Sequence, residues 1–156
     1  PARGLPLRAA ARLPSRSPMK TTHVRAETLP ERWLLYDASK EPLGRLASKI
    51  AVALMGKDRP TYTPSEPNGA FVVVINAQQS VLTGNKEENK YYRTFSGYAG
   101  GLKHHSVPKM RATKPEEIVR LAVKRMLPKS NLGRLLLTRL KVYPAAEHPH
   151  GAQKPS

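Results

Sequence analysis

Cysteine is absent from the 156 residues, acidic side chains are scarce, and no apolar run is long. Without cysteine the chain has no disulfide framework, thiol nucleophile, zinc finger or iron–sulfur site. The longest apolar runs, residues 50–55 and 70–75, are far shorter than the roughly 20 residues that span a bilayer. We therefore expect neither a secreted disulfide scaffold nor membrane insertion.

Because acidic side chains are scarce, the chain carries a large net positive charge. Lys and Arg number 27 and Asp and Glu number 11, so the formal net charge is +16 and the isoelectric point is near 10.5. Self-repulsion of this size does not stabilise a compact domain, so we expect a polyanionic partner. RNA, DNA and an anionic membrane surface are the candidates.

The two ends differ in composition from the middle. Residues 1–25 hold six basic side chains, four prolines and no acid. This composition is typical of an organellar transit peptide and of an RNA-binding tail, and a solvated extension is the third interpretation. Residues 144–156 contain three prolines and show no periodicity, so we expect an extended arm that lies on another surface. The prediction is a basic arm at 1–25, an α/β domain at 26–143 and a C-terminal arm at 144–156.

The middle of the chain predicts one α/β domain. Residues 33–37 and 71–75 are apolar and read as buried strands, and residues 43–54 follow the spacing of one helix face, with Gly56 suited to the helix end. Strand, helix and strand in this order predict a parallel βαβ unit. Residues 80–83 are a weaker predicted strand, and residues 140–143 are a predicted final strand.

Two more helices are predicted in the second half. Residues 113–116 (TKPE) resemble a capping box, and the helix runs from there to Met126 or Leu127. Asn131 is the predicted cap of the next helix. The predicted core residues are Ile118, Val119, Ala122 and Met126 of the first helix and Leu132, Leu135, Leu136 and Leu140 of the second.

Basic side chains gather in two segments of this domain. Residues 120–141 contain seven basic residues and no acid. An ordinary solvated face mixes both signs, so this segment favours neutralisation by phosphates. Its basic residues are Arg120, Lys124, Arg125, Lys129, Arg134, Arg139 and Lys141.

The second segment, residues 84–111, mixes cations with aromatic and glycine residues. Cations neutralise phosphates, aromatic rings stack on unpaired bases, and glycines allow a close approach of the backbone to RNA. The alternative is a β-ribbon whose aromatics pack on the domain. We expect Tyr91 or Phe95 to belong to the core and Tyr98 to be more exposed. The basic residues are Lys86, Lys90, Arg93, Lys103, Lys109 and Arg111, and the central glycines are Gly97, Gly100 and Gly101.

Enzymatic and metal sites have weak support. Residues 84–86 (GNK) do not form a P-loop, and no GxGxxG sequence follows either predicted strand. The His104–His105 pair and His148 with His150 could supply imidazoles, but neighbouring residues of a strand point to opposite faces. We therefore expect no cofactor, no metal site and no catalytic residue.

A series of short motifs follows in order along the chain. They are residues 43–47 (LGRLA), 57–64 (KDRPTYTP), 69–77 (GAFVVVINA), 83–86 (TGNK), 96–98 (SGY), 100–103 (GGLK), 126–129 (MLPK), 132–134 (LGR), 140–143 (LKVY), 147–150 (EHPH) and 152–153 (AQ). By the order and spacing of these motifs, the chain from about residue 19 to residue 155 resembles the L13 family of large-subunit ribosomal proteins.

The resemblance implies a three-layer α/β/α domain on a four-stranded parallel sheet. It also implies binding to large-subunit rRNA beside neighbouring ribosomal proteins, early addition during subunit assembly, and no catalysis. We expect no small-molecule substrate and no homo-oligomer. The predicted RNA-binding residues, from the charge pattern and the resemblance together, are Arg45, Lys57, Arg59, Lys86, Arg93, Gly97, Tyr98, Gly100, Gly101, Lys103, Arg120, Lys124, Lys129, Arg134, Arg139 and Lys141.

Departures from the family pattern bear on the compartment. The basic extension before residue 19 and Arg125, where most members have glycine, favour a mitochondrial ribosome, then a plastid one, then a bacterial one. Three other functions stay open: an extra-ribosomal regulatory RNA-binding protein, a nucleotide-dependent enzyme on the βαβ unit, and a peripheral membrane role for the N-terminal arm.

Overall fold

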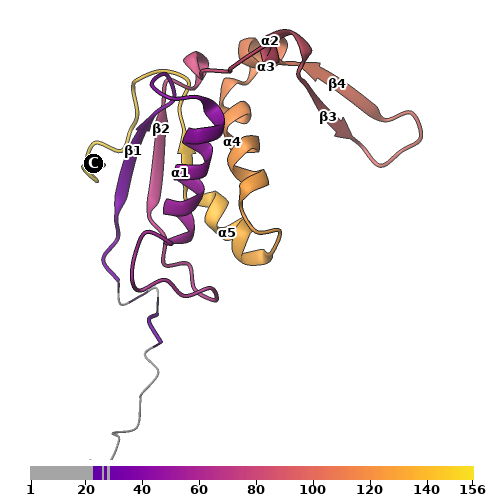
Figure 1. The fold of residues 1–156 in the computed structure, drawn as a ribbon. Helices are drawn as coiled ribbons and strands as arrows, with labels where there is room; N and C mark the ends of the chain where they lie inside the picture. The colour runs from indigo at the N-terminus through magenta and orange to yellow at the C-terminus, as the bar shows by residue number, and fades with distance from the viewer. Residues whose placement is uncertain (1–22, 26, 28) are drawn as a thin grey trace, which may run out of the picture.

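A parallel βαβ unit forms the centre of the structure, a computed structural model that describes residues 23–25, 27 and 29–156 (Figure 1). Strand β1 (Trp33–Asp37) is followed by helix α1 (Leu43–Met55) and strand β2 (Phe71–Ile75). The two strands pair in parallel from Trp33 opposite Phe71 to Asp37 opposite Ile75. The predicted βαβ unit is therefore confirmed. The predictions for residues 1–22 lie outside the described residues.

The parallel sheet has three strands among the described residues, and not the four predicted; β5 (Leu140–Val142) follows β1 and β2 in the order β1–β2–β5. Strand β5 confirms the predicted final strand. Residues 80–83 form no strand, because Val81 makes a single parallel bridge to Pro42. Directly after Pro42 the chain enters α1. Leu43 donates its N–H to the Val81 carbonyl (2.9 Å), and the helix then turns the backbone away from residues 80–83.

Helices α1, α4 (Pro115–Met126) and α5 (Asn131–Thr138) lie on one side of the sheet (Figure 1). Val72 and Val74 face them and are fully buried with Leu46, Ile50 and Leu54. Because strand residues alternate between faces, Val73 points to the other side.

No helix of the described residues covers the other face, so the predicted three-layer α/β/α arrangement is not seen. There Trp33 stacks on Phe71 with the ring centroids 4.7 Å apart, and His150 lies 5.1 Å from Trp33. Ser156 exchanges backbone hydrogen bonds with β1, donating to Trp33 and accepting from Leu35. Residues 144–156 thus lie against the sheet of their own domain.

Helix α1 confirms its predicted face. Leu43, Leu46, Ala47, Ile50, Ala51 and Leu54 are all buried, and Gly56 ends the helix with φ +75°. Glycine adopts this left-handed conformation without the strain that a side chain would cause.

Helices α4 and α5 differ from the prediction in their caps and in part of their core. Residues 113–116 form no capping box: Lys114 is the N-cap without a side-chain hydrogen bond, because the Thr113 hydroxyl donates to the Lys109 carbonyl (2.8 Å). Ser130, not Asn131, caps α5 by accepting from Gly133 N–H. Met126 and Leu135 are 43% and 48% exposed, contrary to prediction.

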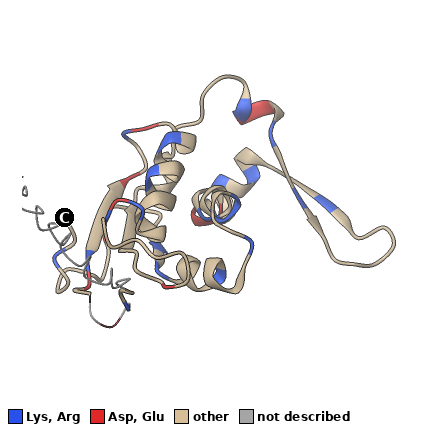
Figure 2. Cartoon of the chain, turned by 60° about the horizontal axis from the view of Figure 1, so that its bottom comes forward, with Lys and Arg blue, Asp and Glu red and all other residues tan. Residues whose placement is uncertain are grey.

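The second half of the chain also holds a separate antiparallel hairpin. Its strands are β3 (Tyr91–Phe95) and β4 (Leu102–Ser106), and Figures 1 and 2 both show it extending away from the helices and the parallel sheet. Short helices precede and follow it: α2 (Lys86–Asn89) and α3 (Val107–Thr113), with the 3₁₀ helix η2 (Ala77–Gln79) earlier in the chain. Within the described residues, no helix has the length and hydropathy needed to cross a membrane.

Candidate nucleic-acid interface

Helix α4 is the centre of the basic surface. Its first turn carries Glu116 and Glu117, and its last turn carries Lys124 and Arg125. The acids near the N-terminus and the cations near the C-terminus both suit the helix dipole. The dipole therefore accounts for the distribution of charge along the helix. Cations of other elements, Lys86, Lys90, Lys129 and Arg134, line hollows together with Lys124 or Arg125, and Figure 2 shows Lys and Arg spread over several elements.

A first hollow joins the end of α4 to the start of α5. Lys124, Lys129 and Arg134 line it, together with Pro128 and Gly133. These three cations form no ion pair with a described residue. Local repulsion among them disfavours the arrangement in isolation, so an anionic ligand would stabilise it. Three of the predicted residues are thus brought together here.

The backbone of this hollow is tightly packed. A Cβ on Gly133 would lie 1.9 Å from the Pro128 carbonyl oxygen, so position 133 requires glycine. The close packing fixes the α4–α5 turn and, with it, the spacing of Lys129 and Arg134.

A second hollow lies where α4, α5 and β5 meet. Arg120 and Lys141 line it together with Thr138. Arg120 lies 3.8 Å from Glu117, one turn earlier on the same helix, and both side chains are exposed. An exposed pair at this distance contributes little, so Arg120 stays available to a phosphate.

A third hollow lies at the N-terminal end of α1. Lys86, Lys90 and Arg125 line it beside Gly44 and Thr83. Lys86 donates to the Thr83 hydroxyl (3.2 Å), and the Lys90 ammonium lies 5.2 Å from the centre of the Tyr92 ring.

Lys90 and Arg125 of this hollow are absent from the predicted set, although Lys86 is in it. Both lie in the two basic segments of the sequence, so the charge pattern alone could have placed them in the predicted RNA-binding set.

The hairpin β3–β4 carries Arg93 and Lys103, and neither forms an ion pair with a described residue. The loop at its tip, residues 96–101, contains Gly97 (φ +91°) and Gly100 (φ +72°). Gly101 donates to the Tyr98 carbonyl (2.9 Å) and closes the loop. Tyr98 is 79% exposed, as predicted.

The prediction that Tyr91 or Phe95 belongs to the core is wrong. Tyr91 is 56% and Phe95 66% exposed, whereas Tyr92 is 3% exposed. Burial raises the pKa of the Tyr92 phenol, and the charges of Arg125 and Arg111 oppose this shift. Tyr92 therefore attaches the hairpin to the domain beside the third hollow.

Arg139, although predicted to bind RNA, is engaged inside the fold. Its Nη1 donates to the carbonyls of Pro67 (2.6 Å) and Gly69 (2.8 Å), and its guanidinium lies 5.0 Å from the centre of the Phe71 ring. Burial lowers the pKa of Arg139, and the charge of Glu31 opposes this. These contacts tie the start of β5 to the loop before β2.

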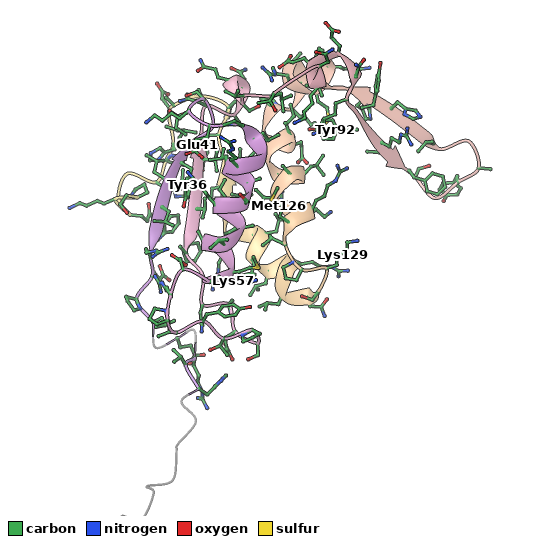
Figure 3. The ribbon with its side chains drawn as sticks, in the orientation of Figure 1. Tyr36, Glu41, Lys57, Tyr92, Met126 and Lys129 are labelled. Atoms are coloured by element: carbon green, nitrogen blue, oxygen red, sulfur yellow. The ribbon has the colours of Figure 1, made fainter. Side chains whose placement is uncertain are left out.

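Of the remaining predicted cations, Arg45 lies in the first turn of α1, whereas Lys57 and Arg59 lie in the loop that follows this helix. Arg45 is exposed on α1, and the Lys57 ammonium lies 5.9 Å from the centre of the Tyr62 ring. Arg59 lines a small cavity with Arg139. Figure 3 places the labelled Lys57 at the end of α1 that is far from the hairpin.

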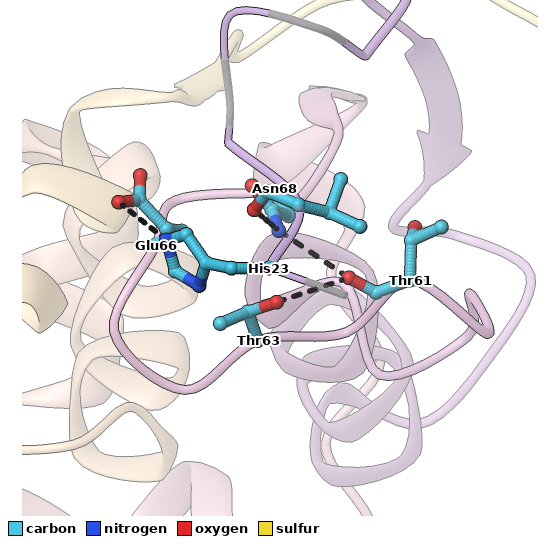
Figure 4. A network of polar contacts seen from close by, with 6 residues as sticks. His23, Thr61, Thr63, Glu66 and Asn68 are labelled. Atoms are coloured by element: carbon cyan, nitrogen blue, oxygen red, sulfur yellow. Dashed lines mark hydrogen bonds and ion pairs between the residues drawn. The ribbon is translucent and has the colours of Figure 1, made fainter. Parts of the chain in front are cut away.

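Asn68 organises this loop, a role that charge and periodicity did not reveal. Its side-chain amide donates to the carbonyls of Thr61 and Val24, both at 3.3 Å, and Thr63 donates to Thr61 (Figure 4). His23 lies 3.6 Å from Glu66 in the same network. The N-terminal residues described here thus hold the loop that carries Lys57 and Arg59.

The carboxyl ends of the parallel strands, a common ligand site in α/β folds, hold a structural network. Asp37 accepts hydrogen bonds from the Ser39 N–H (3.0 Å), the Ser39 hydroxyl (2.7 Å) and the Asn76 amide (3.1 Å). Burial acts to raise the pKa of Asp37, but these hydrogen bonds and the charge of Lys40 lower it overall. No group of three or more metal-ligating side chains occurs among the described residues.

Comparison with known proteins identifies the family. The sequence model of the family described as "Ribosomal protein L13" matches residues 31–149. The protein named "Large ribosomal subunit protein uL13" of Thermoanaerobacter sp. (strain X514) is 53% identical over 137 residues, which are 88% of this chain and 96% of the relative. The proteins of the same name of Gloeothece citriformis (strain PCC 7424) and Thermotoga maritima are each 52% identical over 136 residues, 87% of this chain and 90% and 91% of the relatives.

These matches agree with the motifs quoted above and extend over the described domain. The basic hollows around α4, the hairpin and the α/β sheet all lie inside the matched residues. The chain belongs to the ribosomal protein L13 family.

Proposed function

We propose that this protein is a structural component of the large ribosomal subunit, where it binds rRNA, contacts neighbouring ribosomal proteins and supports subunit assembly. The membership of the L13 family and the name of its relatives support the ribosomal role. The observation that carries RNA binding is the hollow lined by Lys124, Lys129 and Arg134, which form no ion pair with a described residue. A structural role requires no catalytic residue.

The α/β domain acts as a rigid platform for these cations. Helix α4 packs on α1 and β5, and α1 packs on β2, so the buried core holds the three hollows around α4 in fixed relative positions. Phosphates of different RNA segments can therefore be held at defined spacings. The affinity comes mainly from counterion release, because each neutralised phosphate frees bound cations.

A salt titration of RNA binding tests this proposal. About eight phosphate contacts predict a slope of log affinity against log salt of roughly −6 to −7 for the full chain and a large-subunit rRNA fragment. Arg134→Glu and Lys103→Glu each weaken binding and flatten the slope by about one contact. Lys49→Glu is the matched control, because Lys49 pairs with Glu41 and lies outside the predicted set. An unchanged slope in the first two variants would contradict the proposed surface.

The compartment is a separate proposal. The basic residues 1–25 and Arg125 are the grounds for an organellar, first of all mitochondrial, ribosome. The relatives above are bacterial and lend this assignment no support. Fractionation of the source cells tests it: recovery of the protein with ribosomes of purified organelles supports the assignment, and recovery with other ribosomes alone refutes it.

A further inference from the structure

The pairing of β3 with β4 sorts the hairpin side chains onto two faces. Tyr92 packs in the core, and Thr94 shares its face because strand residues alternate. Residues paired across an antiparallel ladder lie on the same face, so Lys103, opposite Thr94, also belongs to it. The opposite face, called the outer face here, carries Tyr91, Arg93 and Phe95 of β3 and Leu102, His104 and Ser106 of β4.

The outer face exposes three large apolar side chains. Tyr91, Phe95 and Leu102 are 56%, 66% and 51% exposed, and Phe95 stands directly opposite Leu102. Exposed aromatic clusters on a soluble domain mark interaction sites. A two-stranded hairpin is also marginally stable by itself, so a ligand on this face would order it.

The charge of the hairpin limits the chemistry of that ligand. Residues 89–115 contain no Asp or Glu, and Arg93 stands directly opposite His104 on the outer face. A cation between two aromatic rings matches a chain that alternates flat bases with phosphates. In a duplex the bases are already stacked on one another, so only the phosphates would be left for this surface.

The spacing of the rings fits the same ligand. Tyr91 and Phe95 are four residues apart in an extended strand, which is about 13 Å. Each ring can therefore stack on a different base. Arg93 lies between the two rings, where the RNA backbone that connects the two bases would pass. We propose that the outer face stacks on unpaired bases of single-stranded RNA, with Lys103 on the other face neutralising phosphate. This inference rests on the proposed function and specifies what the hairpin recognises.

Two oligonucleotides of equal length and phosphate count separate stacking from charge. One carries bases and has no internal pairing, and the other is abasic. The full chain is expected to bind the first at least about 5-fold more tightly, since each stacked base contributes on this scale. Phe95→Ala is expected to reduce this preference by the contribution of one stacked base and to leave the contribution of Tyr91. Phe95→Leu, which keeps an apolar side chain without a ring, is expected to do the same.

Two control variants complete the design. Tyr62→Ala removes a tyrosine that is 38% exposed outside the hairpin, and it should keep the preference for bases. Lys103→Gln should weaken binding to both oligonucleotides by the same factor. Since Phe95 is largely exposed, the melting temperature of the Phe95 variants should match that of the parent protein, which excludes misfolding as the cause.

The outcomes separate this inference from the proposed function. Equal binding of the parent protein to both oligonucleotides would overturn base stacking and leave ribosomal RNA binding intact. A Phe95→Ala protein that keeps its full preference for bases but leaves the large subunit would also overturn it, in favour of a protein partner. If the parent protein binds neither of the two oligonucleotides and no rRNA, the proposed function itself is refuted.

Discussion

Replacing Arg139 by Gln tests whether this cation stabilises the fold, in contrast to the cations that we propose bind RNA. Arg139 donates to the Pro67 and Gly69 carbonyls at 2.6 and 2.8 Å. A hydrogen bond to a charged group contributes about 1.5–3 kcal/mol, and such contributions are not additive. Because Arg139 is partly exposed, we expect a total loss of about 2–3 kcal/mol. In a domain of this size that lowers the melting temperature by about 5–10 °C.

The assay compares Arg139→Gln with Arg134→Gln, which removes an exposed arginine of α5. Urea unfolding gives the free energy of unfolding, and a salt titration gives the number of phosphate contacts. Arg134→Gln should change stability by no more than about 0.5 kcal/mol and flatten the salt slope by about 0.7–0.9. The reasoning fails if Arg139→Gln unfolds like the parent protein and flattens the slope as Arg134→Gln does.

Two further predictions concern the fold that positions the site. Gly69→Ala would place a Cβ 1.8 Å from the Leu54 carbonyl oxygen, so we expect severe destabilisation in thermal melts. Gly44→Ala is its control, because a Cβ there meets nothing within 4 Å, and stability should be kept or raised; equal melting of the two variants would contradict this reading. The pKa of Asp37 is lower in the folded protein than in the unfolded chain. The ionised carboxylate therefore adds to the free energy of unfolding at pH values above the unfolded pKa, and this contribution is lost as the pH falls through the folded pKa. Asp37→Asn should therefore be less stable than the parent protein at pH 7, and the difference should shrink below about pH 4; a difference independent of pH in urea unfolding would refute this.

The parallel βαβ unit could be predicted from the sequence because its signals are local. The apolar positions of α1 repeat with helical spacing, and β2 is an uninterrupted β-branched run. The strand predicted at residues 80–83 does not form, and the reason lies outside these residues. Its neighbour at Pro42 is the start of a helix, which offers Val81 one bridge instead of a ladder.

The site was harder to predict because charge patterns do not show what a side chain contacts. Arg139 looks like its basic neighbours, but its carbonyl partners lie 70 and 72 residues away in the sequence. In the hairpin, strand alternation shows that Tyr91 and Tyr92 face opposite ways without showing which one is buried. The packing of Tyr92 in the core decides this, and it leaves Phe95 exposed.

Sedimentation of the tagged full chain from its own cells tests the central claim most directly. The protein should co-migrate with the large ribosomal subunit on a sucrose gradient and leave that position after extensive ribonuclease digestion. A variant with Lys124, Lys129 and Arg134 all changed to Gln should be depleted from the large subunit while keeping its melting temperature. A parent protein that stays at the top of the gradient, or a triple variant that sediments as the parent does, would contradict the account.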